Sequence, residues 1–264
     1  MQLVELQRTV EGSADEVAVA AISYDGIDVL SAFAGKHGIT YPLLSDEGSP
    51  TIERLGLLNT QIAEERAFWG KPVEERHRGL PYPGTFILDE DGAVVEKLFE
   101  RSHRIRPGGG VLLERLGIQA STATEVATGE GPAVAVAAWV DTPEYFPNQV
   151  VRLFVRVAVD PDFHLYVPPN PDGFTDLSVD LGPTEGVFTL EQVPPQGHPF
   201  SVSGFDETFT VAEGEIDLIV PFYVLEDSGP VTLPITVSYQ ACSDTTCLPP
   251  DTVTLTVELN EIRA

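Results

Sequence analysis

The feature that most constrains the fold is a change of hydrophobic periodicity near the middle of the chain. Up to about residue 117, short apolar runs alternate with segments of helical spacing. From about residue 133, long stretches alternate apolar and polar residues with period two, as in VTLPITVSY at 231–239. Period two is typical of strands and a spacing of three to four is typical of helices. The separation of the two patterns within 264 residues predicts two domains.

Helix and strand signals alternate through the first half. The first ten residues have helical spacing, and VAVAAIS at 17–23 is a continuous apolar run, as in a strand buried on both faces. A helical segment follows at 27–38, with Ile27 among the residues spaced for its apolar face. TFILD and AVVEKLFER, joined by EDG, predict a β-hairpin over 85–101. We therefore expect an α/β domain with a mixed sheet over residues 1–117.

The second half has strand patterns and almost no helix pattern. Residues 118–132 are small and polar without periodicity, which predicts a linker. Alternating segments follow at 149–159, 231–239 and 252–259, with Pro, Gly and Asp between them. Several strands separated by turn signals predict an all-β immunoglobulin-like sandwich over residues 133–264.

The charge of the chain excludes some classes of partner. The formal net charge is −26, and residues 121–264 have 22 acidic and 3 basic side chains with no lysine. Such a surface repels nucleic acid and anionic lipid. No run of about 18 apolar residues is present, so we expect no transmembrane segment, and no signal sequence is visible after Met1.

The only two cysteines, Cys242 and Cys247, lie in YQACSDTTCLPP at the end of an alternating run. A structural disulfide is one interpretation, although so short a loop stabilises by only about 2 kcal/mol. A zinc site needs four ligands, and the nearest histidine in sequence, His198, lies 44 residues before Cys242. A short-span pair in a Pro-bounded loop at a strand end also suits a reversible dithiol. The residues alone leave these alternatives open.

The stretch VSYQACSDTTCLPPDTVTLTV resembles the end of the N-terminal domain of the DsbD thiol:disulfide interchange family. FHLYVPP at 163–169 and FSVSGFDETF at 200–209 fit the same family in order, and the resemblance covers about residues 133–260. It implies an immunoglobulin-like domain whose cysteine pair cycles between dithiol and disulfide and relays electrons in the periplasm.

The resemblance also assigns residue roles. By position, Cys247 would form the mixed disulfide with a partner and Cys242 would resolve it. An aromatic cap loop shields the pair in that family. The aromatic side chains expected around the pair here are Phe200, Phe205, Tyr166 and Tyr239. We interpret His164, next to Tyr166, as a packing residue of the sandwich.

The first half resembles thioredoxin-like domains of the AhpC/TSA and TlpA kind over about residues 1–117. The matching segments are HGITYPLLSDEG and LPYPGTFILDEDG. The proline before Gly-Thr-Phe is cis in that fold, which would make Tyr82–Pro83 a cis bond beside the active site. The alternative is an ordinary proline before a strand.

That resemblance also implies parts that this sequence does not contain. The family places its cysteines at the start of the first long helix, just after a strand, whereas Met1 already lies in the body of that helix and residues 1–120 have no cysteine. We therefore expect a truncated sheet with an interior gap between the strands at 17–23 and 85–89. We also expect a strand, a Cys-x-x-Cys and an export signal upstream of Met1.

These features together predict an extracytoplasmic, periplasmic thiol–disulfide oxidoreductase without a cofactor. The alternative is a non-catalytic binding module with a structural disulfide and a degenerate thioredoxin-like scaffold. The expected partners are proteins with thiols or disulfides, with a membrane electron donor as one candidate, and not nucleic acids.

Overall fold

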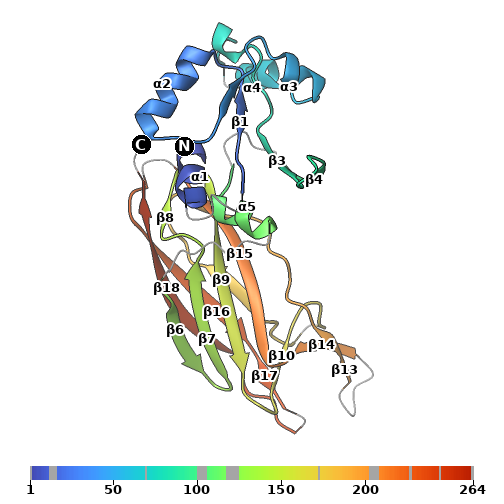
Figure 1. Ribbon diagram of the computed structural model, residues 1–264. Helices are drawn as coiled ribbons and strands as arrows, with labels where there is room; N and C mark the ends of the chain where they lie inside the picture. The colour runs from blue at the N-terminus through green and yellow to red at the C-terminus, as the bar shows by residue number, and fades with distance from the viewer. Residues whose placement is uncertain are drawn as a thin grey trace. The chain divides into compact units, whose positions relative to one another are not determined.

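The structure is a computed structural model that describes residues 2–11, 17–68, 70–99, 106–116, 125–171, 173–201, 208–225, 228–243 and 245–262. The chain forms two compact units, residues 1–119 and residues 120–264 (Figure 1). Within the described part of the chain, every helix is too short or too polar to cross a membrane.

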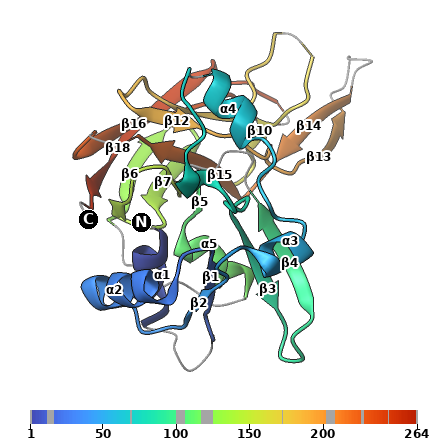
Figure 2. The ribbon, with the colours of Figure 1, turned by 90° about the horizontal axis from the view of Figure 1, so that it is seen from above.

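The first unit alternates helices with short strands. Four of its strands form two separate pairs: β1 runs parallel to β2, and β3 and β4 form the predicted antiparallel hairpin (Figure 2). The elements are α1 (Gln2–Glu11), β1 (Ala21–Ser23), α2 (Ile27–His37), β2 (Leu43–Ser45), α3 (Pro50–Arg54), α4 (Ile62–Phe68), η1 (Glu75–His77), β3 (Gly84–Leu88), β4 (Val94–Phe99), β5 (Arg106–Pro107) and α5 (Gly109–Arg115).

Helix α2 has the boundaries that its sequence predicts, because both ends have suitable residues. Asp28 lies in the first turn and Lys36 in the last, where each complements the helix dipole. Gly38 adopts a left-handed conformation with φ of 67° and donates its N–H to the carbonyl of Ala34. The apolar face is narrower than expected: Leu30 is buried, whereas Ile27 is 71% exposed.

Strand β1 differs from its prediction in length and burial. Of the apolar run at 17–23, only Ala21–Ser23 forms a strand. Ile22 pairs with Leu44 of β2, and the two side chains are 49% and 48% exposed. The expectation of a strand buried on both faces is therefore wrong, because this face of the short β1–β2 pair is not covered.

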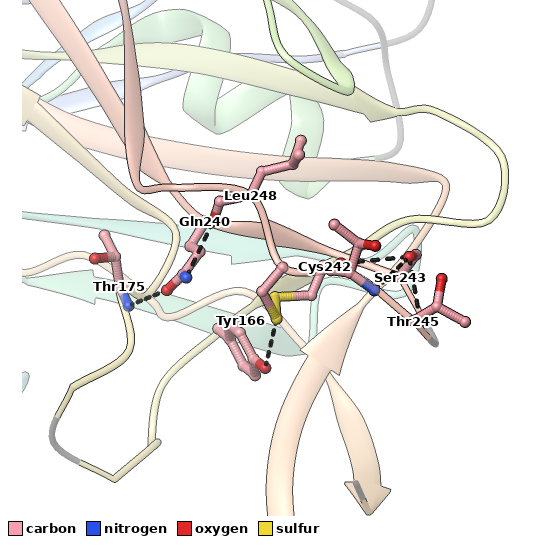
Figure 3. Close-up of a disulfide and its surroundings, with 9 residues drawn as sticks. Tyr166, Thr175, Gln240, Cys242, Ser243, Thr245 and Leu248 are labelled. Atoms are coloured by element: carbon pink, nitrogen blue, oxygen red, sulfur yellow. Dashed lines mark hydrogen bonds between the residues drawn. A yellow bond between two sulfur atoms is a disulfide. The ribbon is translucent and has the colours of Figure 1, made fainter.

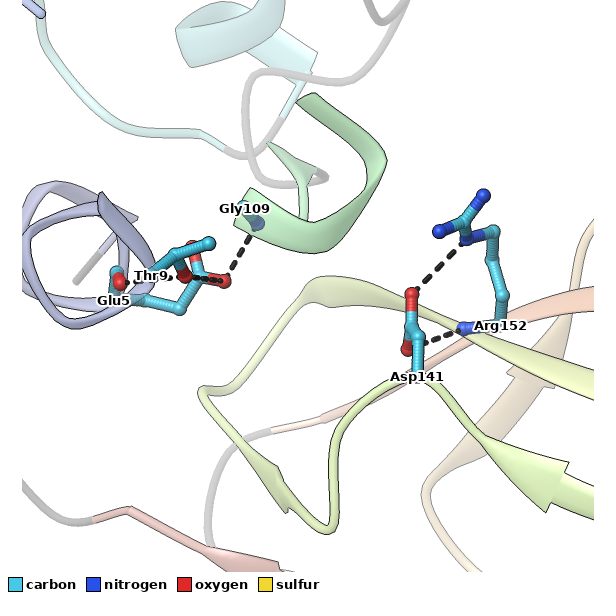
Figure 4. A network of polar contacts seen from close by, with 5 residues as sticks. All are labelled: Glu5, Thr9, Gly109, Asp141 and Arg152. Atoms are coloured by element: carbon cyan, nitrogen blue, oxygen red, sulfur yellow. Dashed lines mark hydrogen bonds and ion pairs between the residues drawn. The ribbon is translucent and has the colours of Figure 1, made fainter. Parts of the chain in front are cut away.

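Helix α1 is attached to the rest of the first unit by polar contacts. The Glu5 carboxylate accepts a hydrogen bond of 2.6 Å from the Gly109 amide at the start of α5 (Figure 4). A side chain at Gly109 would collide with Thr9, so glycine permits this close approach. Gln7 is buried and exchanges hydrogen bonds with Thr40 after α2. These contacts satisfy polar groups that burial would otherwise leave without partners.

The second unit is built of strands in its described residues. One sheet has the order β12-β15-β9-β7-β6 and another the order β11-β16-β18-β8. The strands are β6 (Ala127–Gly131), β7 (Val134–Val140), β8 (Glu144–Tyr145), β9 (Gln149–Val159), β10 (His164–Tyr166), β11 (Ser178–Leu181), β12 (Val187–Thr189), β13 (His198–Ser201), β14 (Thr208–Ala212), β15 (Glu215–Val224), β16 (Val231–Tyr239), β17 (Ala241–Cys242) and β18 (Asp251–Glu261).

The two sheets share one hydrophobic core. Alternate residues of β7, β9 and β15 join alternate residues of β16 and β18 in a single buried cluster. In β9, for example, Val151, Leu153, Val155 and Val157 are at most 1% exposed. Burying an aliphatic side chain contributes on the order of 2 kcal/mol, so this core is the main source of stability of the unit.

Strand β6 corrects the predicted linker. Residues 127–131 lie within the segment 118–132 but pair with β7. Their sequence, ATGEG, has no alternating apolar residues, so periodicity does not reveal the strand. Its glycines fit it to the other sheet instead: side chains at Gly129 and Gly131 would collide with Val253 and with the Tyr239 hydroxyl.

A third, smaller sheet positions the cysteines. Its order is β13-β14-β10-β17, and β17 contains Cys242. The alternation along β10 divides its side chains between two clusters. Leu165 belongs to the main core, whereas Tyr166 packs with Phe209 and Cys242 in a second cluster.

Candidate functional site

Cys242 and Cys247 form a disulfide in the loop that joins β17 to β18, with their Cα atoms 4.0 Å apart (Figure 3). Their backbones also form an isolated antiparallel bridge. The two cysteines differ in exposure: Cys242 is 1% exposed, whereas Cys247 is an exposed residue. One end of the bond therefore lies in the interior and the other at the surface.

The loop between the cysteines is held by its own backbone and by Ser243. The Ser243 amide donates to the Thr246 carbonyl at 2.7 Å, and the Leu248 amide donates to the Ala241 carbonyl at 2.9 Å. The Ser243 hydroxyl oxygen accepts hydrogen bonds from the amides of Thr245 and Thr246. Serine side chains favour such local contacts, and these contacts define the turn that brings Cys247 back beside Cys242.

Gln240 connects this loop to the segment after β10. Its Nε2 donates to the Leu248 carbonyl at 3.1 Å, and its Oε1 accepts from the Thr175 amide at 3.2 Å (Figure 3). Asn170 attaches the same segment to β14: it donates to the Thr210 carbonyl at 3.1 Å and accepts from the Thr210 amide at 2.8 Å. The surroundings of the disulfide are thus connected by hydrogen bonds on two sides.

Aromatic rings cover the interior side of the disulfide. Tyr166 is 1% exposed and its ring packs against Phe174 and Phe209, at centroid distances of 4.8 and 5.6 Å. The Tyr166 hydroxyl lies 3.9 Å from Sγ of Cys247 and is the donor of that weak contact, because a disulfide sulfur has no hydrogen. Burial raises the pKa of Tyr166, so the hydroxyl remains protonated at neutral pH.

The structure brings together some of the predicted site residues. Tyr166 contacts Cys247, and Phe200 on β13 packs partly buried against the second cluster. Tyr239 lies instead in the main core, where its hydroxyl donates to the Pro132 carbonyl at 3.1 Å. Phe205 lies outside the described residues.

Pro83 belongs to the first unit, directly before β3. The expected cis bond is wrong: Tyr82–Pro83 is trans, and the cis bond found in the described chain joins Pro168 to Pro169. The Tyr82 amide donates to the Leu57 carbonyl, and Pro81 forms a bridge with Leu58. These contacts place Pro83 as an ordinary proline that leads into a strand, which is the alternative interpretation of the sequence.

Three neighbours of the disulfide are not among the predicted site residues. Phe174 and Phe209 complete the aromatic cluster, and His164 lies across from Cys242 in the antiparallel register of β10 and β17. The sequence contains one usable signal for His164, its position two residues before Tyr166, which places both on one face of a strand. Phe174 lies in a loop, where no periodicity indicates its contacts.

The unequal exposure of the two cysteines determines how the disulfide can react. Among the described residues, no group of three or more His, Cys, Asp or Glu side chains is placed to hold a metal ion. A disulfide with one exposed and one buried end can be attacked at the exposed sulfur, with the buried sulfur as the leaving group.

Comparisons with known proteins match the two units to different families. Residues 1–97 match the AhpC/TSA family, and residues 136–259 match the N-terminal domain of the thiol:disulfide interchange protein DsbD. No curated protein sequence matches the chain.

Several solved structures are similar to the chain at a low level. The N-terminal periplasmic domain of ScsB from Proteus mirabilis has a TM-score of 0.40 and 14% identity, and the match covers 52% of each chain. The GAE domain of GGA2p from Saccharomyces cerevisiae has a TM-score of 0.33 and 9% identity, covering 51% of this chain and 97% of that one.

A complex between the DsbD and PilB N-terminal domains from Neisseria meningitidis has a TM-score of 0.26 and 16% identity, covering 40% of this chain and 73% of that one. At these TM-scores the likenesses establish no common fold, and the chain spans only about half of the ScsB domain. The sequence matches are more informative: this is a two-part chain, whose first 97 residues match the AhpC/TSA family and whose residues 136–259 match the DsbD N-terminal family.

Proposed function

We propose that this chain is an extracytoplasmic thiol–disulfide oxidoreductase that relays electrons through the Cys242–Cys247 pair. The observation that supports this most directly is the unequal exposure of the two cysteines. Cys247 is exposed in a short loop, whereas Cys242 is 1% exposed and packs in the second cluster. We therefore expect a partner thiolate to attack Sγ of Cys247 and not Sγ of Cys242.

The proposed exchange has two steps. A thiolate of a partner dithiol attacks Sγ of Cys247, a new S–S bond forms, and Cys242 leaves with the electron pair of the broken bond. The second thiolate of the partner then attacks the partner sulfur that is bonded to Cys247, which forms the partner's disulfide and releases Cys247. The partner loses two electrons and becomes a disulfide, and the cysteine pair gains them as a dithiol. The reverse sequence reduces a partner.

The family matches support the finer features of the proposal. We infer an immunoglobulin-like arrangement for the second unit, a periplasmic location, and partners that are proteins with thiols or disulfides, one of them a membrane electron donor. The matched DsbD family is one of thiol:disulfide interchange, and a DsbD N-terminal domain forms a complex with a PilB N-terminal domain. Phe200 and Phe205 are the residues that we propose as the aromatic cover of the pair.

Single-cysteine variants test the roles of the two sulfurs. Cys242→Ser leaves the exposed thiol without its resolving partner, so it should hold a partner in a stable mixed disulfide. Cys247→Ser leaves a buried thiol and should hold little. The measurement uses a thioredoxin variant that keeps one of its two active-site cysteines, activated as a mixed disulfide with thionitrobenzoate, and compares the cross-linked product on non-reducing gels. The Cys247 thiolate displaces thionitrobenzoate, and no second thioredoxin cysteine is present to reopen the new bond. Equal trapping by both variants, or none by Cys242→Ser, would contradict the assignment.

The rival function is a binding module in which the disulfide is permanent. The reduction potential of the pair separates the two functions. A value between those of thioredoxin and protein disulfide isomerase, about −270 to −180 mV, supports a relay. A value below about −300 mV indicates a structural bond and would refute the proposed function.

A further inference from the structure

One titratable side chain faces the disulfide and has no part in the exchange described so far. His164 on β10 pairs directly with Cys242 on β17. Directly opposed residues of an antiparallel pair point to the same face, with Cβ atoms about 5 Å apart. His164 is 4% exposed, and its Nε2 is shielded from solvent. The register therefore places the imidazole on the same face of the small sheet as the Cys242 side chain.

Neighbouring rings fix the orientation of this imidazole. The ring of Phe200 lies 4.4 Å away, tilted by 50°, and the ring of Tyr166 lies 5.9 Å away, nearly perpendicular. Contacts on two sides restrict the side-chain rotamers, and aromatic faces also favour a cation. Burial disfavours an unpaired imidazolium, and the aromatic faces offset part of that cost.

Basic groups are scarce in this part of the molecule. In the described strands of the small sheet, the basic side chains are His164 and His198. His198 is 54% exposed and lies 3.8 Å from Glu213, away from the buried cluster. The arginines of the second unit's strands pair elsewhere: Arg152 with Asp141, and Arg156 with Asp217. His164 is thus the described base that lies next to the cysteine pair.

In the proposed exchange, the departing Cys242 sulfur becomes negatively charged, and a neighbouring base that can carry a proton would stabilise it. When a thiolate opens the bond at Cys247, Cys242 leaves as an anion in an apolar cluster formed with Tyr166, Phe209 and Val211. An unpaired charge in such surroundings is strongly destabilised. A cation or a proton beside the sulfur removes that cost, and a better-stabilised leaving thiolate departs faster.

We propose that His164 stabilises the departing sulfur of Cys242 and supplies its proton, which makes this histidine a further functional residue of the thiol–disulfide site. The inference rests on the proposed function for its biological meaning. The balance is simple: the imidazolium gives one proton to the Cys242 thiolate and becomes neutral imidazole, and it recovers a proton from solvent after each cycle. In the reverse direction, neutral His164 takes the proton of the Cys242 thiol as the disulfide forms.

The pH dependence of the exchange depends on few other groups. Among the described residues of β10 and of the strands packed against it, the titratable groups are Tyr166, Cys242, His198 and, just after β14, Glu213. Tyr166 stays protonated because burial raises its pKa. His198 and Glu213 are more than half exposed, so solvent screens their effect on the buried sulfur.

The first test measures the Cys242 thiol and does not require any redox cycling. In the full chain with Cys247→Ser, Cys242 is the remaining thiol, and its titration is followed by thiolate absorbance near 240 nm. Adding His164→Phe should raise the thiol pKa by at least about one unit, because the neighbouring cation is lost. His164→Gln keeps a polar group without the charge and should give the same rise. His198→Gln is the matched control and should leave the pKa unchanged.

The second test measures disulfide opening by dithiothreitol in the chain with both cysteines. With the rate normalised to thiolate concentration, His164→Phe and His164→Gln should be about tenfold slower than the unsubstituted chain. In the unsubstituted chain the normalised rate of disulfide opening should decline as His164 loses its proton with rising pH. The two His164 variants should show no such decline. His198→Gln should keep both the rate and the pH dependence of the unsubstituted chain. An unchanged thiol pKa together with an unchanged rate profile in the His164 variants would overturn the inference. A reduction potential below about −300 mV, together with the expected rise in the Cys242 thiol pKa in the His164 variants, would refute the electron relay but support proton transfer between His164 and Cys242.

Discussion

Reduction of the Cys242–Cys247 bond should destabilise the second unit only slightly. The cysteines are separated by 5 positions in sequence, so the closed loop is very short. The chain-entropy relation gives about 2 kcal/mol for a loop of this length. The main core lies in a different cluster from Cys242, so opening the bond removes none of its contacts. We therefore expect the free energy of unfolding to fall by about 2 kcal/mol on reduction.

The stabilisation of about 2 kcal/mol also determines how far folding shifts the reduction potential of the cysteine pair. Because folding and reduction are linked, a stabilisation of 2 kcal/mol makes the pair about 40 mV more reducing in the folded chain than in the unfolded chain. That shift is too small to move a typical dithiol into the range of structural disulfides. We therefore expect the pair to exchange with other protein dithiols, as the proposed function requires.

Urea unfolding of the oxidised and phosphine-reduced chains measures the difference. A Trp69→Phe background leaves Trp139 on β7 as the single tryptophan, so fluorescence reports on the second unit. A chain with both cysteines replaced by serine should show no effect of the reductant. A loss above about 4 kcal/mol on reduction would refute the reasoning, because the disulfide would then act as a staple of the fold.

Two further outcomes follow from buried rings of the second unit. Phe209→Ala removes a ring that is 0% exposed between Tyr166 and Phe174, so it should cost about 3–5 kcal/mol in urea unfolding, whereas Phe188→Ala, at 46% exposure, should cost less than about 1 kcal/mol. Burial, with the nearby Asp251 charge, raises the pKa of Tyr239 to about 12, above its value near 10 in the unfolded chain, so stability should fall between pH 10 and 12 as the unfolded state ionises first. Tyr239→Phe should cost about 1 kcal/mol at neutral pH through the lost bond to Pro132 but show a shallower alkaline decline, and parallel declines in the two chains would contradict this.

The sequence predicts two central strands well because burial alternates throughout 231–239 and from Val151 to Val157 within 149–159. Residues 149–159 and 231–239 are predicted and observed as strands with the same limits, since one face of each lies in the core and the other does not. Strand β6 is not predicted because close packing, and not hydrophobicity, determines its position. Gly129 and Gly131 allow the close approach of the opposite sheet. Hydrophobic periodicity identifies the buried face of a strand from its side chains, and glycine has no side chain to contribute to that pattern.

The candidate site is predicted in part for a similar reason. The pairing of the cysteines is accessible to local sequence, because the two residues are close along the chain. Tyr166 is indicated by the resemblance of FHLYVPP to the DsbD family, and its hydroxyl lies near Sγ of Cys247. Tyr239 is close to Cys242 in sequence, but the alternation of β16 directs it into the main core. His164 requires the register between β10 and β17, strands about 75 residues apart, which no local pattern contains.

The placement of the site on β10 explains how the second unit can combine a rigid scaffold with a reactive bond. Leu165 points into the main core, and its neighbours His164 and Tyr166 point to the side of the disulfide. Packing of Leu165, which is 0% exposed, fixes the strand, and the strand in turn fixes the two rings beside the sulfurs. Opening the disulfide then changes contacts on one face of β10 only. We expect groups held on a strand with its other face in the core to keep their geometry in both oxidation states, as the proposed exchange with a docked partner requires.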